Sequence, residues 1–464
     1  MLALLSDLHF CDETAVERNV APAAFRIALD SIYKMALELQ RATQAEVPLD
    51  VVFLGDIFDL LRSERWFEQG PVLVPPRERP WGSAAALGTT RPPEVVLGHA
   101  RGILEAAIQK NEQALATLRQ KRPELDGKVR VRRFLVTGNH DRLSLHDDRL
   151  HVRMREALGA EDERTLNAPG FGTHGLMLPE YGLLARHGHE WDAWNFNRVP
   201  DAAPPGMLAG TDYLPAPIGD PITTEIAVRL PLEMRRRLAD ARALSPEQVA
   251  SIHARLQHIE DVRPVVTALQ WAFQEVDEVS RSLGPDQRGA LLDALDGSVA
   301  TIVREFQALD YYRAWQDGHR LFHLDTQALL RDLFELLGAF RARTFAGLAP
   351  HFAKLADKLE DSAGRDVFRE GARKEALDAL GRGGLRHVIY GHTHDAAFAP
   401  LRARDTYLNT GTFRRRIFHA DDHQGFADAE LLTYVCLFTR DEAKVGWGGD
   451  GPAYTTWTGT RTPG

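Results

Sequence analysis

The stretch Val51-Val52-Phe53-Leu54-Gly55-Asp56-Ile57-Phe58-Asp59 changes within a few residues from apolar to acidic. Its apolar half is typical of a strand that is buried on both faces. Two aspartates follow at the point where such a strand should end. In open α/β sheets, ligands bind beyond the carboxyl ends of the strands. The stretch therefore predicts an α/β sheet with a polar site at the end of this strand.

The same arrangement recurs in four further segments, in which a short apolar run precedes aspartate, asparagine or histidine. They are Leu2-Ala3-Leu4-Leu5 before Asp7-Leu8-His9, Phe134-Leu135-Val136 before Gly138-Asn139-His140-Asp141, Leu183-Leu184-Ala185 before His187-Gly188-His189, and Val388-Ile389-Tyr390 before Gly391-His392-Thr393-His394. One such cluster would occur easily by chance, and a lone histidine is more often structural than a ligand. The repetition predicts that several strand ends deliver their donors to one metal site.

The order of these clusters resembles the calcineurin-like metallophosphoesterase superfamily. Its pattern is Asp-x-His, Gly-Asp-x-x-Asp, Gly-Asn-His-Asp/Glu, His-Gly and Gly-His-x-His, and every ligand position is matched here. The step Asn409-Thr410-Gly411-Thr412, after the last cluster, also recurs in that superfamily. The resemblance covers residues 1 to about 200 and about 385 to 440. It implies an α/β (α+β) fold, a four-layer αββα sandwich of two mixed sheets.

The resemblance also implies a role for each matched residue. Asp56 is expected to bridge two divalent metal ions. The remaining ligands form two sets, which are Asp7, His9 and His394 for the first ion, and Asn139, His187 and His392 for the second. His140 is expected to assist the leaving group, with Asp59 orienting its ring and Asp141 as the alternative orienting residue. Both aspartates could instead cap the start of a helix.

The types of donor and the expected pair of metal ions indicate the class of reaction. Mixed carboxylate, amide and imidazole donors suit Mn, Fe, Zn or Co better than Ca, and the metal identity stays open. Two adjacent ions clamp the attacking and leaving oxygens at phosphorus and lower the pKa of a shared water. We therefore expect hydrolysis of a phosphoester by in-line attack of a metal-bridging hydroxide.

The substrate is expected to be a nucleotide or another phosphorylated metabolite, with monoester, diester and pyrophosphate chemistry all open. Three residues near the clusters are candidate substrate contacts: Arg62, His189 and Arg414. Arg414 opens a run of three arginines, which is more often a salt-bridged edge strand. Two alternative functions remain, a nucleic-acid nuclease and an interaction protein of the same fold with little catalysis.

The chain has 464 residues, 44% hydrophobic and 26% charged residues, and a net charge of -9, values ordinary for a globular protein. The negative charge does not favour nucleic acid as the substrate. Two cysteines exclude a disulfide framework. No apolar run reaches membrane-spanning length, and Met1 leads directly into the first strand, so we expect a cytoplasmic protein without a membrane partner.

The motifs divide the chain into a first core segment, residues 1–222, a helical insertion, residues 223–382, and a second core segment, residues 383–464. The insertion shows helical periodicity and a strong helix start at Ser245-Pro246-Glu247-Gln248. It carries no metal motif, so we expect a cap over the site or a partner arm through which the chain could oligomerise. Residues 63 to about 97 are expected to form a long irregular loop that could wall the site, and residues 446–464 an irregular tail. Arg235-Arg236-Arg237 is expected on a solvated helix face.

Overall fold

The computed structural model describes the chain except residues 17–19, 70–71, 163–169, 198–207, 263–264, 319–323, 343–350, 352–353, 356–364, 381–384, 403–404, 420–425, 450 and 462–464. The described residues form a mixed α/β structure with two six-stranded sheets and one two-stranded sheet. The boundary expected near residue 382 lies outside the described residues.

The first six-stranded sheet contains the strands that precede the first three donor clusters. Its strands are β1 (Leu2–Leu5), β2 (Val47–Leu54), β5 (Val129–Val136), β12 (Phe413–His419), β13 (Phe426–Phe438) and β14 (Ala453–Arg461). β2 runs parallel to β1 and β5, whereas β13 runs antiparallel to β1, β12 and β14. Leu5 pairs with Phe53 and Leu54 pairs with Val136, so these three strands end at the same edge.

The second six-stranded sheet contains the strands before the other two clusters. Its order is β10 (Ala396–Pro400), β11 (Thr406–Thr410), β9 (His387–Tyr390), β8 (Leu183–Ala185), β7 (Gly175–Leu178) and β6 (Phe171–Gly172). β8, β9 and β11 are parallel, and Ala185 pairs with Ile389. Their carboxyl ends therefore also share one edge.

The two sheets pack on each other through a buried apolar cluster. Leu4, Val52 and Val136 contribute to it from the first sheet, and Leu183 and Ile389 from the second. These are the apolar runs whose lack of alternation predicted strands buried on both faces.

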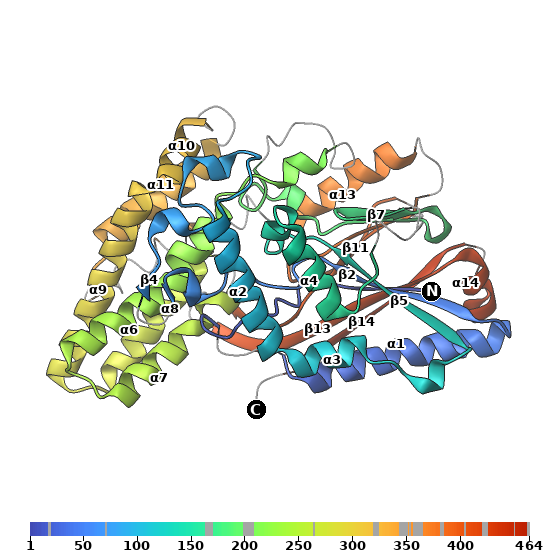
Figure 1. The fold of residues 1–464 in the computed structure, drawn as a ribbon, viewed down its shortest axis with the longest axis horizontal. Coiled ribbons are helices and arrows are strands. Elements are labelled where there is room, and N and C mark those ends of the chain that lie inside the picture. Colours follow the sequence, from blue (N-terminus) through green and yellow to red (C-terminus); the bar gives the residue numbers. More distant parts are fainter. Residues whose placement is uncertain are drawn as a thin grey trace.

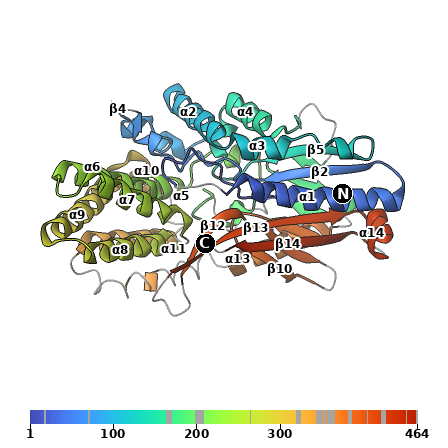
Figure 2. The ribbon, with the colours of Figure 1, turned by 90° about the horizontal axis from the view of Figure 1, so that it is seen from below.

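Helices cover the remaining faces of the sheets. α1 (Pro22–Thr43) contacts β2, β5 and β13 of the first sheet, and α13 (Arg365–Leu380) contacts β9 and β11 of the second. α2 (Glu94–Lys110), α3 (Glu112–Arg119), α4 (Asp148–Leu158) and α14 (Arg440–Trp447) lie around the first sheet (Figures 1 and 2). α2 and α3 follow each other directly and are separated at Asn111.

The predicted insertion is helical where it is described. α5 (Gly219–Ile222) leads into it. Its described elements are a π-helical segment Thr223–Val228, α6 (Arg229–Ala241), α7 (Pro246–Leu256), the 3₁₀ segment Gln257–Asp261, α8 (Val265–Arg281), α9 (Pro285–Ala308), α10 (Asp310–Gly318), α11 (Leu324–Ala339) and α13. Ser245 caps α7 as predicted, because its hydroxyl accepts from the Gln248 amide and the Gln248 side chain accepts from the Ser245 amide. Figure 1 shows α6 to α11 gathered at one end of the molecule, beyond the sheets.

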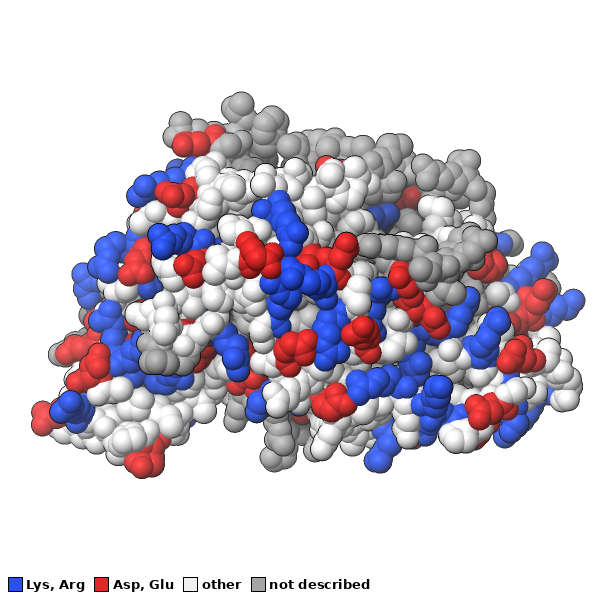
Figure 3. All heavy atoms as spheres, in the orientation of Figure 1, with Lys and Arg blue, Asp and Glu red and all other residues white. Residues whose placement is uncertain are grey.

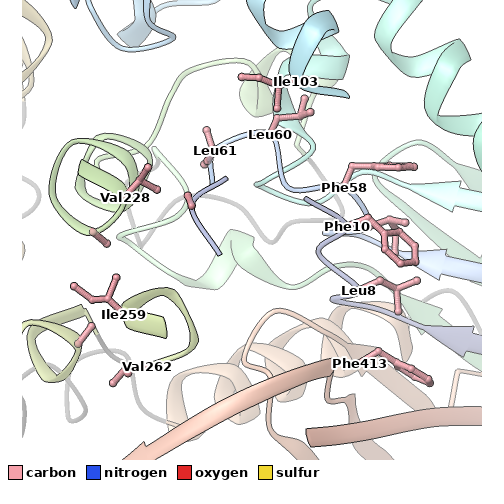
Figure 4. Close-up of a cluster of buried hydrophobic side chains, with 14 of the residues drawn as sticks. Leu8, Phe10, Phe58, Leu60, Leu61, Ile103, Val228, Ile259, Val262 and Phe413 are labelled. Atoms are coloured by element: carbon pink, nitrogen blue, oxygen red, sulfur yellow. The ribbon is translucent and has the colours of Figure 1, made fainter. Parts of the chain in front are cut away.

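These helices share one hydrophobic core with the rest of the chain. Leu60 and Leu61, just after the Asp56 cluster, lie in the same buried cluster as Val228 and Ile259 of the insertion (Figure 4). The cluster continues to Phe10, beside the first donor cluster. The insertion therefore packs directly on the loops that follow the strands, and it does not stand apart as a separately packed arm.

The expectations of an irregular tail and of a solvated arginine triplet are wrong. The tail from residue 446 contains the end of α14 and the strand β14, which pairs with β13 along Glu430 to Phe438. The long loop after the Asp56 cluster holds β3 (Glu68–Gln69), β4 (Val72–Leu73) and short 3₁₀ turns. Its Trp66 is fully buried and donates to the Leu60 carbonyl at 2.7 Å, so this ring belongs to the core.

The arginine triplet of α6 is half-buried and bonded, not solvated. Arg235 lies 3.1 Å from Glu64, and Arg236 lies 2.9 Å from Glu68. Both contacts join the insertion to the loop after the Asp56 cluster. No helix within the described residues is long and apolar enough to cross a membrane.

A core substitution in the insertion tests whether the two parts fold together. Ile259 is 1% exposed, so Ile259→Ala should lower the free energy of unfolding by about 2–5 kcal/mol. Ile27→Ala on α1, where the side chain is 59% exposed, should change it by less than about 0.5 kcal/mol. Calorimetry should show the insertion and the sheets unfolding in one shifted transition. A separate early transition, with the sheets unfolding at the wild-type midpoint, would contradict the shared core.

Candidate metal centre

The ends of five strands bring the donor clusters together. Three groups of side chains have donor atoms within 4.8 Å of one another: Asp7, His9 and His394; His9, Asp56 and His140; and Asp56, His187 and His392. β1, β2 and β5 of one sheet and β8 and β9 of the other precede these residues directly. The two sheets thus meet at one rim, and each strand supplies a donor to it.

The backbone at this rim is held in an unusual conformation. Asp7, His9, Asp56, His392 and His394 have positive φ angles of 54°, 46°, 52°, 69° and 60°. Such angles cost non-glycine residues roughly 1–3 kcal/mol each and persist only where the surroundings enforce them. Strain that is concentrated at matched ligands points to a functional role for their orientation.

Two glycines of the motifs are required by close contacts. A Cβ on Gly138 would lie 2.2 Å from Oδ1 of Asp56, and one on Gly55 would lie 2.4 Å from Nδ1 of His187. Gly55 also has a φ of +85°, which favours glycine. The motif glycines therefore allow the donor loops to pack against one another.

The donor atoms of the first group, Asp7, His9 and His394, lie close to one another. Nε2 of His9 and Nε2 of His394 are 2.9 Å apart, and Oδ1 of Asp7 lies 3.3 Å from Nε2 of His394. Nδ1 of His9 donates to Oδ2 of Asp59 at 2.9 Å, which leaves Nε2 as the lone-pair nitrogen. The three atoms are therefore suitable ligands for one cation.

The second donor group also contains buried acceptor atoms that could bind a cation. Nδ1 of His187 donates to the Leu54 carbonyl at 3.0 Å, so in the neutral ring Nε2 carries the lone pair. This atom lies 3.1 Å from Oδ2 of Asp56. Among the described residues, Oδ1 of Asn139 and Nδ1 of His392 are buried without a hydrogen-bond partner. Unsatisfied buried acceptors are costly, and a metal ion at this point would satisfy them.

Asp56 lies between the two groups. Its Oδ2 is 3.1 Å from Nε2 of His187 and 3.8 Å from Nε2 of His9. Its other oxygen accepts from the His140 amide at 2.9 Å. This position is compatible with a carboxylate that serves both groups.

The buried aspartates of the donor groups favour positive charge close to them. Burial raises the pKa of Asp56 and of Asp59, but the surrounding histidines, and for Asp59 also Arg62, hold both pKa values well below the usual value. Burial lowers the pKa of His187 and of His140, but the neighbouring aspartates raise them to about 10 and about 9. Buried ionised carboxylates need compensating charge, which metal ions would supply.

His140 and Asp59 are in direct contact. Nδ1 of His140 donates to Oδ1 of Asp59 at 2.9 Å, and Asp59 also accepts from the amides of Leu61 and Arg62. Asp59 therefore combines the expected pairing with the capping role considered as its alternative. Asp141 instead accepts from the Phe58 amide at 2.9 Å, and from two further amides, so it holds the Asp56 loop in place.

The candidate substrate contacts are all buried. Nε of Arg62 lies 3.1 Å from Oδ2 of Asp59, behind the donor groups. His189 is buried beside Glu190, and burial lowers the pKa of its ring to about 3. Arg414 donates to the His9 carbonyl at 3.1 Å and lies 3.0 Å from Asp261 of the insertion. This arginine joins β12, the first donor loop and the insertion, and its assignment as a substrate contact stays a prediction.

The insertion, and Asp220 just before it, reach the three donor loops of the first sheet through polar bonds. The first loop is reached by way of Arg414 of β12, which donates to the His9 carbonyl. The polar bonds are Arg414 to Asp261 at 3.0 Å, Thr224 to the Leu61 carbonyl at 3.1 Å, and Arg142 to Asp220 at 2.7 Å. The motif analysis missed all of them, because the partners lie in a segment without motifs. It also missed Asp192, whose Oδ2 lies 2.9 Å from Nε2 of His392. Its position directly after the His187 cluster was the available signal.

Comparison with models of known protein families, with curated proteins and with solved structures finds no match for this chain.

The anchoring role of Arg414 is testable through stability. Arg414→Leu leaves Asp261 buried without its partner, so the free energy of unfolding should fall by about 3–5 kcal/mol. Arg415→Leu breaks a half-exposed pair with Asp428 and should cost no more than about 1 kcal/mol. Denaturant titration of both variants measures the difference. Equal stability of the two variants would argue against the anchor.

Proposed function

We propose that this protein is a metal-dependent phosphoesterase that hydrolyses a nucleotide or another phosphorylated metabolite. The observation that carries the proposal is the convergence of the Asp7 group and the His187 group on either side of Asp56. In this proposal the two six-stranded sheets, with α1 and α13 outside them, are the αββα sandwich that the motif order implies.

The donors fit two ions of the Mn, Fe, Zn or Co type. Asp7, His9 and His394 would hold one, Asn139, His187 and His392 the other, and Asp56 both. When bound, such ions stabilise the charge on the phosphoryl oxygens and lower the pKa of an attacking water. The buried acceptors on Asn139 and His392 support this assignment.

His140 is proposed to donate a proton to the leaving oxygen. Asp59 accepts the Nδ1 proton, so Nε2 is the nitrogen that faces away from Asp59. Burial lowers the pKa of His140, but Asp59 and Asp56 raise it to about 9, which favours the protonated ring that a proton donor needs. Arg62 stabilises the ionised form of Asp59 and so helps to hold this pair.

The charge distribution favours a small substrate over nucleic acid. On the face shown in Figure 3, Lys and Arg are interspersed with Asp and Glu. Arginines on α4 are paired with glutamates on α2. Arg149 lies 2.7 Å from Glu94, and Arg153 lies 2.7 Å from Glu105. Paired arginines are less available to bind a phosphate backbone.

Hydrolysis of model esters tests the function. With Mn²⁺ added, the protein should cleave bis-p-nitrophenyl phosphate or p-nitrophenyl phosphate, lose activity on chelation and recover it with Mn²⁺. Asp56→Ala should abolish turnover and reduce the two ions expected per chain, whereas the exposed Asp30→Asn should retain both. Wild-type protein that binds two ions but cleaves neither ester with Mn, Fe, Zn or Co would favour the interaction-protein alternative.

A second test isolates His140. His140→Ala should keep both ions and lose about 10²–10⁴-fold in rate on an alkyl phosphate ester, because the leaving alkoxide then lacks a proton donor. The loss should shrink for p-nitrophenol, which leaves readily without protonation. His351→Ala, an exposed histidine, serves as the control. Undiminished cleavage of the alkyl ester by His140→Ala would refute the role.

A further inference from the structure

A short turn after β8 connects two of the proposed ligands. Oδ2 of Asp192 accepts from Nε2 of His392 at 2.9 Å and from Nδ2 of Asn195 at 2.7 Å. Oδ1 of Asn195 in turn accepts from Nδ2 of Asn139 at 3.3 Å. A continuous chain of hydrogen bonds thus links His392 of the second sheet to Asn139 of the first.

These hydrogen bonds leave one acceptor atom available for a metal ion on each of the two proposed ligands, His392 and Asn139. Because Nε2 of His392 donates to a carboxylate, its Nδ1 is the lone-pair nitrogen, and this atom is buried without a hydrogen-bond partner among the described residues. Because Nδ2 of Asn139 donates to Asn195, its Oδ1 is the atom turned the other way, and it is also unsatisfied. Carboxylates that bind the far nitrogen of a ligand histidine fix its tautomer and increase its basicity.

Two helices at the borders of the insertion contact this turn, α5 just before the insertion and α13 near its end. The Gly219 amide donates to the Trp194 carbonyl at 2.7 Å, and a Cβ on Gly219 would lie 2.8 Å from Oδ1 of Asn195. At the other end, a Cβ on Gly371 of α13 would lie 2.5 Å from the Trp191 ring. Glycine at both positions allows α5 and α13 to close on the turn.

We infer that Asp192 and Asn195 are positioning residues for the second metal ion, and that the insertion acts on this ion by fixing their turn. Neither side chain is within the matched motifs. The inference deepens the proposed function, since it takes His392 and Asn139 as ligands of the second ion. The first ion depends on Asp7, His9 and His394, none of which contacts the turn through a described hydrogen bond.

Titration with Mn²⁺ separates the two ions. In calorimetry and in metal analysis after gel filtration, Asp192→Ala should bind the first ion as wild type does and the second about 10–100-fold more weakly. Asp192→Asn should lose less, because its amide oxygen still accepts from Nε2 of His392. Asn195→Ala should also weaken only the second ion, and Asp30→Asn should change neither.

The outcomes distinguish the inference from the proposed function. Wild-type protein that binds fewer than two Mn²⁺ ions overturns the dinuclear site itself. Wild-type protein with two ions, together with wild-type affinity in Asp192→Ala or equal weakening of both ions, overturns the positioning role. If Asp192→Ala does not fold, the isosteric Asp192→Asn and Asn195→Ala decide, and unchanged second-ion affinity in both overturns the inference.

Discussion

The burial of three ionised carboxylates at one point is the constraint around which this structure is organised. Asp7, Asp56 and Asp59 are almost completely removed from water, where each charge is costly unless it is paired. Imidazoles from both sheets, amides from the loops and one buried guanidinium surround them. The strained backbone at the ligands is retained because this packing determines where each donor points.

The same constraint explains the position of the helical insertion. The donor loops of the first sheet carry polar backbone groups and apolar residues such as Leu60 and Leu61, which must be covered. The insertion covers them with an apolar surface, and Thr224 bonds to the loop after β2. Asp220, just before the insertion, bonds to the loop after β5, and Asp261 bonds to Arg414, which holds the loop after β1. The insertion therefore helps to hold the donor loops in place, although it contributes no proposed ligand. Through these contacts it could also affect substrate specificity.

Several sequence expectations failed for one physical reason. An arginine run such as 235–237 is solvated unless its partners are nearby, and those partners, Glu64 and Glu68, lie far away in sequence. Likewise β14 is Thr-rich and has no apolar alternation of its own, so its pairing with β13 comes from the exposed edge that β13 offers. Local pattern carries no information on a partner that is brought close only by folding.

The sequence by itself determined the strands, the donor clusters at their ends and the helical character of the insertion. These features are local: apolar runs, capping residues and the spacing within each motif specify them without reference to distant residues. Only the tertiary structure decided which nitrogen of each histidine carries the lone pair, that Arg414 is an anchor, and that Asp192 and Asn195 join two ligands. Those properties depend on contacts between segments as distant as Asp192 and His392, because hydrogen-bond roles and burial are set by the groups that surround a side chain in space.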